Sequence, residues 1–441
     1  MLSEFRARLL ADGQAERLLH QMLERLRAQG LLVQGGRQRT DATCVAAARE
    51  LNRLELVTET MRAALEALAA AAPTWLVALA PDEWYERYGQ RASDYRLPQA
   101  KPARAALAVT VGADGFVLLE AVHATDTPGW LRQVPAVQIL RAVWIQQYYR
   151  DRHGLRWRGK GEQPPAARAI DSPYDPHARY GINRGVGWRG YKAHFTKTCQ
   201  PDRPHLIVHV ATTADVETMP ARHADLANLE PLPDQHLVDA AYVSVDGVLA
   251  TRADHGVELV GPLPPDSGWQ ARDEGGFDLT QFRIDWDRKQ VTCPTGTTSR
   301  NWRRPPAATG CPSSMWPCPP RLRPLPGAHA LHPLTHQRPR PDLPAPCQYQ
   351  TQQQLHAEQA TTTWQDRYAH RSGIEGTIAQ ASHRADLHQT RYHGLPKTHL
   401  QHVLTALALN LVRVDAWLTG TPLGGGWTSR LTRLRPALSP M

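Results

Sequence analysis

The sequence predicts an α/β protein built on a mixed β-sheet. Two hydrophobic patterns alternate along the chain: apolar residues three and four positions apart, typical of amphipathic helices, and apolar runs or alternation over strand lengths. Acidic residues stand on or just after three of the expected elements, at Asp41, Asp239 and Glu375. At 441 residues the chain is long enough to bury a sizeable core and to hold more than one structural unit.

The first elements are two short helices and a strand. Residues 1–30 carry leucines at helical spacing, and the pattern is interrupted near Gly13, which predicts two amphipathic helices. We interpret this segment as the remnant of a longer amino-terminal helical region. A glycine pair beginning at Gly35 ends the helical pattern, and the short strand expected after it carries Asp41.

A helical segment follows this strand. From 46 to 160 the apolar residues recur at helical spacing, and the last helix is rich in aromatic residues and is expected to end in Trp144, Tyr148 and Tyr149. We expect this segment to be an insertion into the sheet-forming part of the chain.

The strands of the core lie in the middle of the chain. Segments 190–196 and 205–213 alternate or run apolar and predict two paired strands, and a helix of about ten residues precedes the short apolar strand that leads to Asp239. Counting the Asp41 strand first, the order is strand, strand, strand, helix, strand. This is the order of an RNase-H-like fold, and it predicts a catalytic core over 31–262 with the helical insertion inside it.

The amino-acid composition changes twice in the last third of the chain. Residues 263–302 are aromatic and strand-prone, which predicts a β-rich insertion before the last catalytic helix. Between 303 and 350, thirteen prolines accompany a single acid, which is consistent with a flexible Pro/Arg-rich linker or with a segment translated out of frame. Residues 351–420 are expected to form the catalytic helix and a packing helix, followed by a tail over 421–441.

Composition and charge narrow the function classes. The formal charge is +9 and arginine outnumbers lysine, a balance that suits contact with phosphate groups. The start of the chain lacks a signal-peptide core, and we expect no apolar run as long as a membrane span, hence a cytoplasmic protein without a membrane partner. The cysteines include no C-x2-C pair and indicate neither a zinc ribbon nor a disulfide framework; they are Cys44, Cys199, Cys293, Cys311, Cys318 and Cys347.

The most informative motif combines a tyrosine, an arginine and a glutamate at spacing Y-x2-R-x3-E. Tyr368, Arg371 and Glu375 stand in an expected helical stretch, where intervals of three and four place side chains on one face. A carboxylate that can hold a metal ion would then lie beside a guanidinium that can hold a phosphate.

This motif resembles the Y-R-E-K signature of DDE transposases from bacterial insertion sequences. The lysine of that signature is absent, because Ser382 stands seven residues after Glu375. Further segments resemble one group of these transposases, and the resemblance covers nearly the whole chain apart from 303–350. They are Gln38-Arg-Thr-Asp-Ala-Thr43, 171–180, Trp188-Arg-Gly-Tyr-Lys-Ala-His194, His236-Leu-Val-Asp-Ala-Ala-Tyr242 and Arg371-Ser-Gly-Ile-Glu-Gly-Thr377. The family's D-S-T motif reads Asp-Ala-Thr here.

The resemblance implies a set of site residues. Asp41, Asp239 and Glu375 would be the catalytic carboxylates that hold two Mg²⁺ ions, or Mn²⁺, for phosphoryl transfer. Tyr368 and Arg371 would contact DNA. The chain would cleave and join the ends of an insertion sequence, bind double-stranded transposon ends and target DNA, and form a homodimer in that complex. The family also implies that the chain is truncated at its amino terminus.

Alternative interpretations exist for several residues. Asp171 also follows a strand-like segment, but Pro173 and the Asp175-Pro176 pair indicate a loop, so Asp41 is the better first carboxylate. Asp215 is expected to cap a helix.

Lys192 and His194 are expected on one face of a strand, facing either DNA or solvent, and we assign Lys192 to DNA binding. Tyr368 and Arg371 could instead brace their helix. Trp269, Trp286 and Trp302 are expected in the core, with base stacking by one of them as a lesser possibility. A catalytically inactive remnant that only binds DNA, and a nuclease on the same fold, are the alternative functions.

Overall fold

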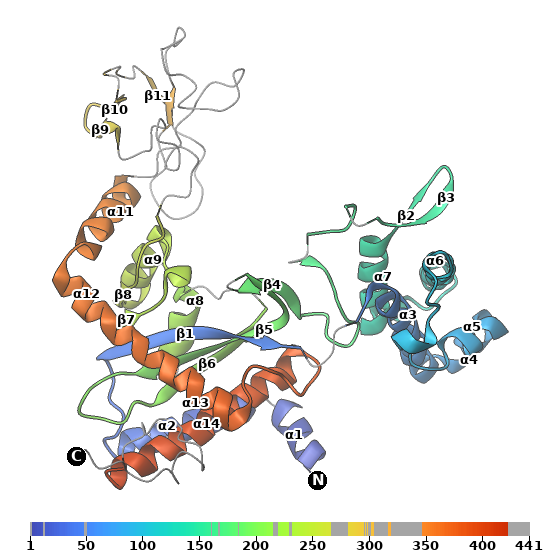
Figure 1. Cartoon of the computed structure of the whole chain (residues 1–441), viewed down its shortest axis with the longest axis horizontal. Coiled ribbons are helices and arrows are strands. Elements are labelled where there is room, and N and C mark those ends of the chain that lie inside the picture. Colours follow the sequence, from blue (N-terminus) through green and yellow to red (C-terminus); the bar gives the residue numbers. More distant parts are fainter. Residues whose placement is uncertain are drawn as a thin grey trace, which may run out of the picture.

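The fold is taken from a computed structural model of the chain (Figure 1). The residues that it describes are 2–11, 14–47, 51–159, 161–165, 168–183, 185–214, 219–228, 232–265, 281–294, 296, 298, 301–303, 316–318 and 346–421. Asp215, Trp269, most of the 303–350 segment and nearly all of the expected tail lie outside the described residues.

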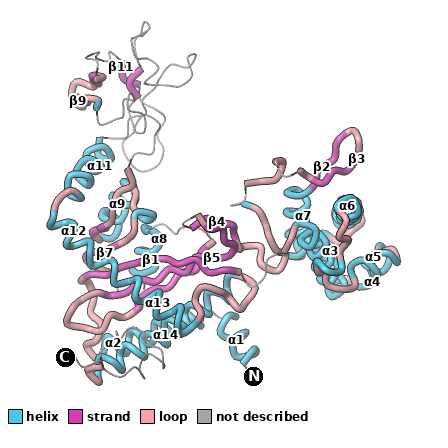
Figure 2. Tube along the Cα trace, in the orientation of Figure 1, coloured by secondary structure: helices cyan, strands magenta, loops and turns pink. Residues whose placement is uncertain are grey.

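A six-stranded mixed sheet forms the centre of the molecule (Figure 2), so the predicted α/β class with a mixed sheet is confirmed. The order β4-β5-β1-β7-β8 runs across the sheet, and β6 pairs with β5. Strands β4, β5, β6 and β1 are joined by antiparallel pairing, whereas β7 and β8 run parallel to β1. The strands are β1 (Arg37–Ala46), β4 (Arg179–Asn183), β5 (Val186–Thr198), β6 (Ile207–Thr213), β7 (Gln235–Leu237) and β8 (Glu258–Val260).

One glycine allows the longest strand to change partners. Gly190 of β5 pairs with Arg179 of β4 and with Ala46 of β1. Its φ is +151°, and a Cβ there would lie 2.0 Å from the carbonyl oxygen of Val45. Only glycine accommodates so close a backbone approach.

Helices cover both faces of the sheet. One face packs against α1 (Leu2–Ala11), α2 (Gln14–Ala28), α13 (Glu375–Ala385) and α14 (Leu395–Leu418), and the other against α8 (Met219–Asn228) and α9 (Val245–His255) (Figure 1). The first core contains Val45, Phe195 and Leu206 of the sheet region with Ile374 and Val403. The two amino-terminal helices and the closing helix thus form where the leucine periodicity predicts them.

The predicted helical insertion after β1 has its own core (Figure 1). It contains α3 (Arg53–Ala71), α4 (Pro73–Leu79), α5 (Asp82–Tyr88), η1 (Asp94–Arg96), α6 (Lys101–His123), η2 (Gly129–Gln133) and α7 (Pro135–Gln147), followed by a hairpin of β2 (Tyr148–Asp151) and β3 (Gly154–Trp157). The expectation that the aromatic helix includes Tyr148 and Tyr149 is wrong. Both residues belong to β2, because the chain turns extended after Gln147 to pair with β3.

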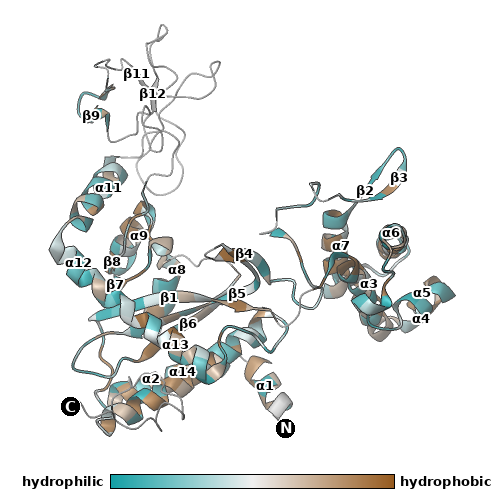
Figure 3. Ribbon diagram, viewed as in Figure 1, coloured by the Kyte–Doolittle hydropathy of each residue, from teal (hydrophilic) through white to brown (hydrophobic). Residues whose placement is uncertain are grey.

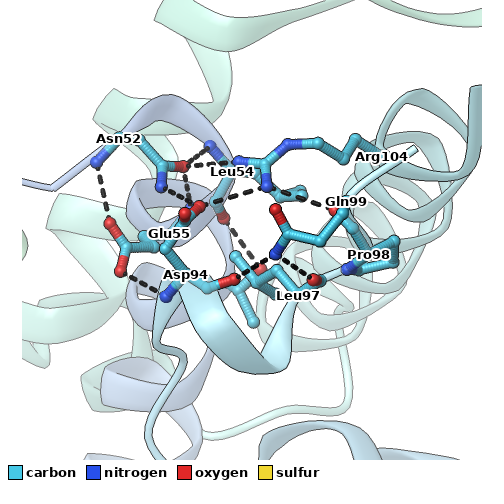
Figure 4. Close-up of polar contacts among 9 residues, drawn as sticks. Asn52, Leu54, Glu55, Asp94, Leu97, Pro98, Gln99 and Arg104 are labelled. Atoms are coloured by element: carbon cyan, nitrogen blue, oxygen red, sulfur yellow. Dashed lines mark hydrogen bonds and ion pairs between the residues drawn. The ribbon is translucent and has the colours of Figure 1, made fainter. Parts of the chain in front are cut away.

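Side-chain capping fixes the start of this insertion. Asn52 accepts hydrogen bonds from the backbone of Leu54 and Glu55, and Glu55 in turn accepts from the Asn52 backbone (Figure 4). Glu55 also accepts from the backbone N–H of Asp94, and Arg104 of α6 pairs with the Asp94 carboxylate. This reciprocal capping ties the first turn of α3 to the loop before α6.

Helix α6 corrects one expectation. Among the described residues it is the one helix that is long and apolar enough to cross a membrane, with a mean hydropathy of 1.8, so the prediction that no apolar run reaches that length is wrong. Ala108, Val111, Leu118 and Val122 are fully buried against the other helices of the insertion. A core helix passes the same test of length and composition, and 39% of the apolar window of α6 is buried in the insertion. Figure 3 colours this helix by hydropathy beside the other helices of the insertion.

Short strand pairs and three further helical segments lie in the last part of the described chain. In the predicted β-rich region, β9 (Arg283–Asp285) pairs with β10 (Gln290–Thr292). At the end of this region β11 (Asn301–Arg303) pairs with β12 (Trp316–Cys318), which lies within the Pro/Arg-rich 303–350 segment. The ring of Trp286 lies 5.8 Å from that of Tyr349. After this region α11 (Pro346–Gln359), α12 (Thr362–Ala369) and η7 (His370–Ile374) lead into α13 and cross the edge of the sheet that contains β7 and β8 (Figure 1).

A carboxylate cluster around Arg371

Asp41 lies in the middle of β1, opposite Phe195 of β5. Side chains alternate along a strand, so Arg39, Asp41 and Thr43 share one face. The backbone N–H of Ala42 donates to Asp41 Oδ1 at 2.8 Å, and only 14% of the Asp41 side chain is exposed. Its place in β1 and this hydrogen bond therefore hold the Asp41 carboxylate in a fixed, mostly buried position.

Asp239 comes two residues after the end of β7, the strand that runs parallel to β1. It caps the short η4 turn (Ala240–Tyr242), where the Ala240 N–H donates to Asp239 Oδ1 at 2.8 Å. Because β7 runs parallel to β1 and ends beside Arg39, the residues that follow it bring Asp239 close to Asp41 at the carboxyl end of β7.

The Y-R-E motif spans three consecutive elements. Tyr368 is near the end of α12, Arg371 lies in the 3-10 turn η7, and Glu375 is the first residue of α13. The expected continuous helix is therefore interrupted by a tighter turn, which short 3-10 segments often form at helix ends. The ring of Tyr368 stacks on Trp364, with 4.9 Å between centroids and 16° between planes.

All three predicted carboxylates converge on the Arg371 guanidinium. Its Nη2 donates to Asp41 Oδ2 at 2.6 Å and lies 3.7 Å from Asp239 Oδ2, and its Nη1 donates to Glu375 Oε1 at 3.2 Å. The exposed fraction of the side chain is 14% for Asp41, 47% for Asp239 and 66% for Glu375, so Asp41 is the most buried of the three. Three acids against one cation leave the cluster net negative.

Burial and charge act in opposite directions on the innermost pair. Burial raises the pKa of the Asp41 carboxyl, and Asp239 and Glu375 raise it further, against Arg371 and the Ala42 N–H, which lower it. Burial lowers the pKa of Arg371, but the surrounding carboxylates reverse this and the net shift is upward. Burial also raises the pKa of Tyr368. The guanidinium thus keeps its charge, whereas folding disfavours the ionised form of the deepest carboxylate.

The donor set matches one class of metal ion. Among the described residues, no group of three or more His, Cys, Asp and Glu side chains is already arranged to hold a metal. In this structure the carboxylates are oriented on Arg371, which supplies the positive charge between them. Their oxygen atoms are nevertheless the ligands that Mg²⁺ and Mn²⁺ prefer.

A pocket of about 290 Å³ opens next to the cluster. Asp41 and Asp239 are among the residues that line it, together with Lys192 and Trp188 of β5. The expectation that His194 faces DNA or solvent is wrong, because it is fully buried and its ring nitrogens contact Tyr242 and Thr213. Lys192 supplies the pocket with a cation.

The rival first carboxylate lies elsewhere. Asp171 is in a loop and pairs with Arg189, whose Nε lies 3.2 Å away, whereas the three predicted carboxylates converge on Arg371. Ser382, at the position of the expected lysine, donates to the Ile378 carbonyl and lies 2.9 Å from His388, whose other nitrogen is 3.5 Å from Thr43.

Sequence reasoning missed two buried basic side chains behind the η7 turn. Lys197 donates to the Gly373 carbonyl at 2.7 Å, and Arg39 donates to the His370 carbonyl. Arg39 stands two residues before Asp41, and strand alternation could have placed it on the same face as that acid. Nothing in the sequence pairs Lys197 with a turn 176 residues away.

Comparison with protein families supports a DDE transposase. Residues 343–414 match the family described as "Transposase DDE domain". That range contains the whole Y-R-E motif together with α11, α12, η7 and α13, and most of α14. Comparisons with curated proteins and with solved structures gave no match. The family match supports a transposase-type function, and this family implies DNA binding and nucleic-acid processing.

Proposed function

We propose that this chain is a transposase of an insertion sequence, which cuts DNA strands at the ends of the element and transfers them to a target. The observation that carries the proposal is the convergence of Asp41, Asp239 and Glu375 on Arg371. The three carboxylates come from a strand, the end of a neighbouring strand and the start of a helix, and the last of them falls inside the matched range.

We further propose that the core has an RNase-H-like arrangement over 31–262, completed by 351–420. The strand order β6-β5-β1-β7-β8, antiparallel on one side of β1 and parallel on the other, supports this arrangement. The helical insertion then lies between the first two strands of the core, and the β-rich region lies before the helix that carries Glu375.

The carboxylates would hold two divalent metal ions. DDE transposases generally use such metals, which activate the attacking oxygen and stabilise the leaving oxygen in phosphoryl transfer. Mg²⁺ is the natural choice for an all-oxygen donor set, and Mn²⁺ is a close substitute. The burial of Asp41 and its hydrogen bond from Ala42 keep this ligand fixed, while the more exposed Asp239 and Glu375 face the side from which DNA arrives.

Cations around the carboxylates would hold the DNA backbone. Arg371 carries a planar fork of donors that matches a phosphate, and Lys192 lies in the adjoining pocket. The Tyr368 hydroxyl is close enough for all four charged members of the cluster to influence its pKa. We propose that the protein acts in the cytoplasm on double-stranded transposon ends and target DNA, as a homodimer in the complex.

A strand-transfer assay tests this function. Purified protein is incubated with Mg²⁺, a target plasmid and labelled duplexes that carry the ends of the element, and the products are separated on a denaturing gel. A transposase gives joined product. Cleavage without joining would identify a nuclease on the same fold, and binding without cleavage would identify an inactive remnant, so either result would overturn the proposal.

A further inference from the structure

The turn that presents Arg371 and Glu375 packs on two buried basic side chains. Arg39 of β1 and Lys197 of β5 are register partners in the sheet and are 6% and 5% exposed. Arg39 donates to the carbonyl of His370, and Lys197 donates to the carbonyl of Gly373 at 2.7 Å. The two side chains therefore hold the first residue of η7 and the residue before its last.

Within the described residues, no ion pair joins Arg39 or Lys197 to an aspartate or glutamate, and their side-chain nitrogens contact backbone carbonyls and the His205 ring. Burial lowers the pKa of Lys197 to about 6, so at neutral pH its amine holds the Gly373 carbonyl mainly as a neutral hydrogen-bond donor. Burying basic side chains away from carboxylates opposes folding. A gain in stability therefore explains their placement poorly, and their contacts with the η7 backbone explain it better.

Glycine at 373 makes the contact possible. A Cβ at Gly373 would lie 2.0 Å from Arg39 Nη1 and 2.4 Å from Arg39 Cζ, so the backbone of the turn lies directly on the guanidinium. Three residues further on, a Cβ at Gly376 would meet nothing within 4 Å. Gly373 thus packs against a side chain of the sheet, whereas a methyl group at Gly376 would meet open space.

We propose that Arg39 and Lys197 are positioning residues: by holding the backbone of η7 against the sheet they keep Arg371 and Glu375 directed at Asp41. This inference rests on the proposed function for its catalytic consequence. The chain of contacts is short, because Arg39 is two residues from Asp41 and Gly373 is two residues from both Arg371 and Glu375. A shift of the η7 turn would therefore move Glu375 away from Asp41, although neither of these two residues had been substituted.

The two glycines provide matched variants. Gly373→Ala should lower turnover at saturating DNA by more than about tenfold, since a misplacement of about 1 Å costs that much or more. Gly376→Ala should stay within about twofold of the parent, because its methyl group meets open space. Arg39→Lys keeps a cation but removes the crowded guanidinium, so it should restore part of the turnover of Gly373→Ala. Equal turnover in both alanine variants, or no rescue, would overturn the proposal.

A second measurement is independent of catalysis. The coupling between Arg371 and Asp41 is read from the melting temperatures of Arg371→Ala, Asp41→Asn and the double variant. The cycle is then repeated with Lys197→Met. The proposal predicts a clear coupling in the parent and a loss of at least half of it in Lys197→Met. If the parent cleaves no DNA but this loss occurs, the proposed function fails and the positioning role stands. An unchanged coupling, with normal cleavage, would overturn the positioning role alone.

Discussion

At the scale of single residues, Asp41 is the proposed first metal ligand, and its burial disfavours the ionised form of its carboxyl group. It is the most buried of the three acids, and burial is the largest cause of its raised pKa. A carboxyl whose pKa is raised on folding binds its proton more tightly in the folded state. Its contribution to stability is therefore fully present below its ordinary value of 3.8 and is lost as pH rises through the folded pKa.

This linkage predicts the behaviour of Asp41→Asn. At about pH 7 the variant should unfold at a higher denaturant concentration than the parent, because it lacks the ionised buried carboxylate. The difference should shrink as pH is lowered through the folded pKa of Asp41. Urea titrations of both proteins across this range measure it. A variant that is less stable than its parent at neutral pH would contradict the account.

A second prediction at the residue scale concerns Arg371. Its guanidinium compensates three carboxylates in the absence of DNA. Arg371→Ala should therefore bind Mn²⁺ more tightly than the parent, because the metal no longer competes with a cation for the same oxygens. Calorimetric titration of the DNA-free proteins measures the affinity.

Arg367→Ala is the matched control for this titration. Arg367 lies one turn earlier, where it pairs with Glu258 at 2.7 Å, and it makes no ion pair with the cluster among the described residues. Its removal should leave Mn²⁺ affinity unchanged. Equal Mn²⁺ affinities in Arg371→Ala and the parent would show that the guanidinium does not compete with the metal for the carboxylate oxygens.

At the scale of elements, α6 shows why an apolar helix need not leave the core. Gly115 faces Trp144 of α7, whose indole N–H donates to the Gly112 carbonyl at 2.9 Å. A Cβ at Gly115 would lie 2.2 Å from the Trp144 ring. Close approach of the two helices at glycine is what buries both of them.

Gly115→Ala should therefore destabilise the protein by about 1–3 kcal/mol, the usual cost of overpacking a core. Alanine is otherwise favoured over glycine inside a helix by about 1 kcal/mol, so a loss of stability isolates the collision with Trp144. Gly129→Ala serves as control, because a Cβ there meets nothing within 4 Å. Chemical denaturation compares the three proteins, and a stabilised Gly115→Ala would contradict this packing.

The elements also show what the sequence can predict. Apolar periodicity located the helices at both ends, and the glycine pair at Gly35 located the strand that carries Asp41, because these patterns depend on near neighbours along the chain. The 3-10 turn between Tyr368 and Glu375 was not predicted, since the interval of three between Tyr368 and Arg371 fits both helix types. The contacts of Arg39 and Lys197 with η7 were also missed, because they join segments that only the folded sheet brings together.

At the scale of the whole molecule, separate parts of the chain meet at one point. The first carboxylate lies before the helical insertion, the second after it, and the third beyond the β-rich region. The insertion has its own core, separate from the core beside the sheet. The chain has a net charge of +9, whereas three acids surround one arginine in the cluster, a combination that suits a protein that attracts DNA and holds metal ions at one place.

The most direct test of the central claim is to neutralise the acids one at a time and measure strand cleavage. Asp239→Asn and Glu375→Gln keep the shape of each side chain and remove its charge, so each should lower the cleavage rate in Mg²⁺ by about 100-fold or more, whereas DNA affinity should stay level or rise. Asp171→Asn, which removes the rival carboxylate beside Arg189, should cleave at nearly the parental rate. Cleavage at the parental rate by either of the first two variants, or its loss in a folded Asp171→Asn, would show that the cluster around Arg371 is not the catalytic centre.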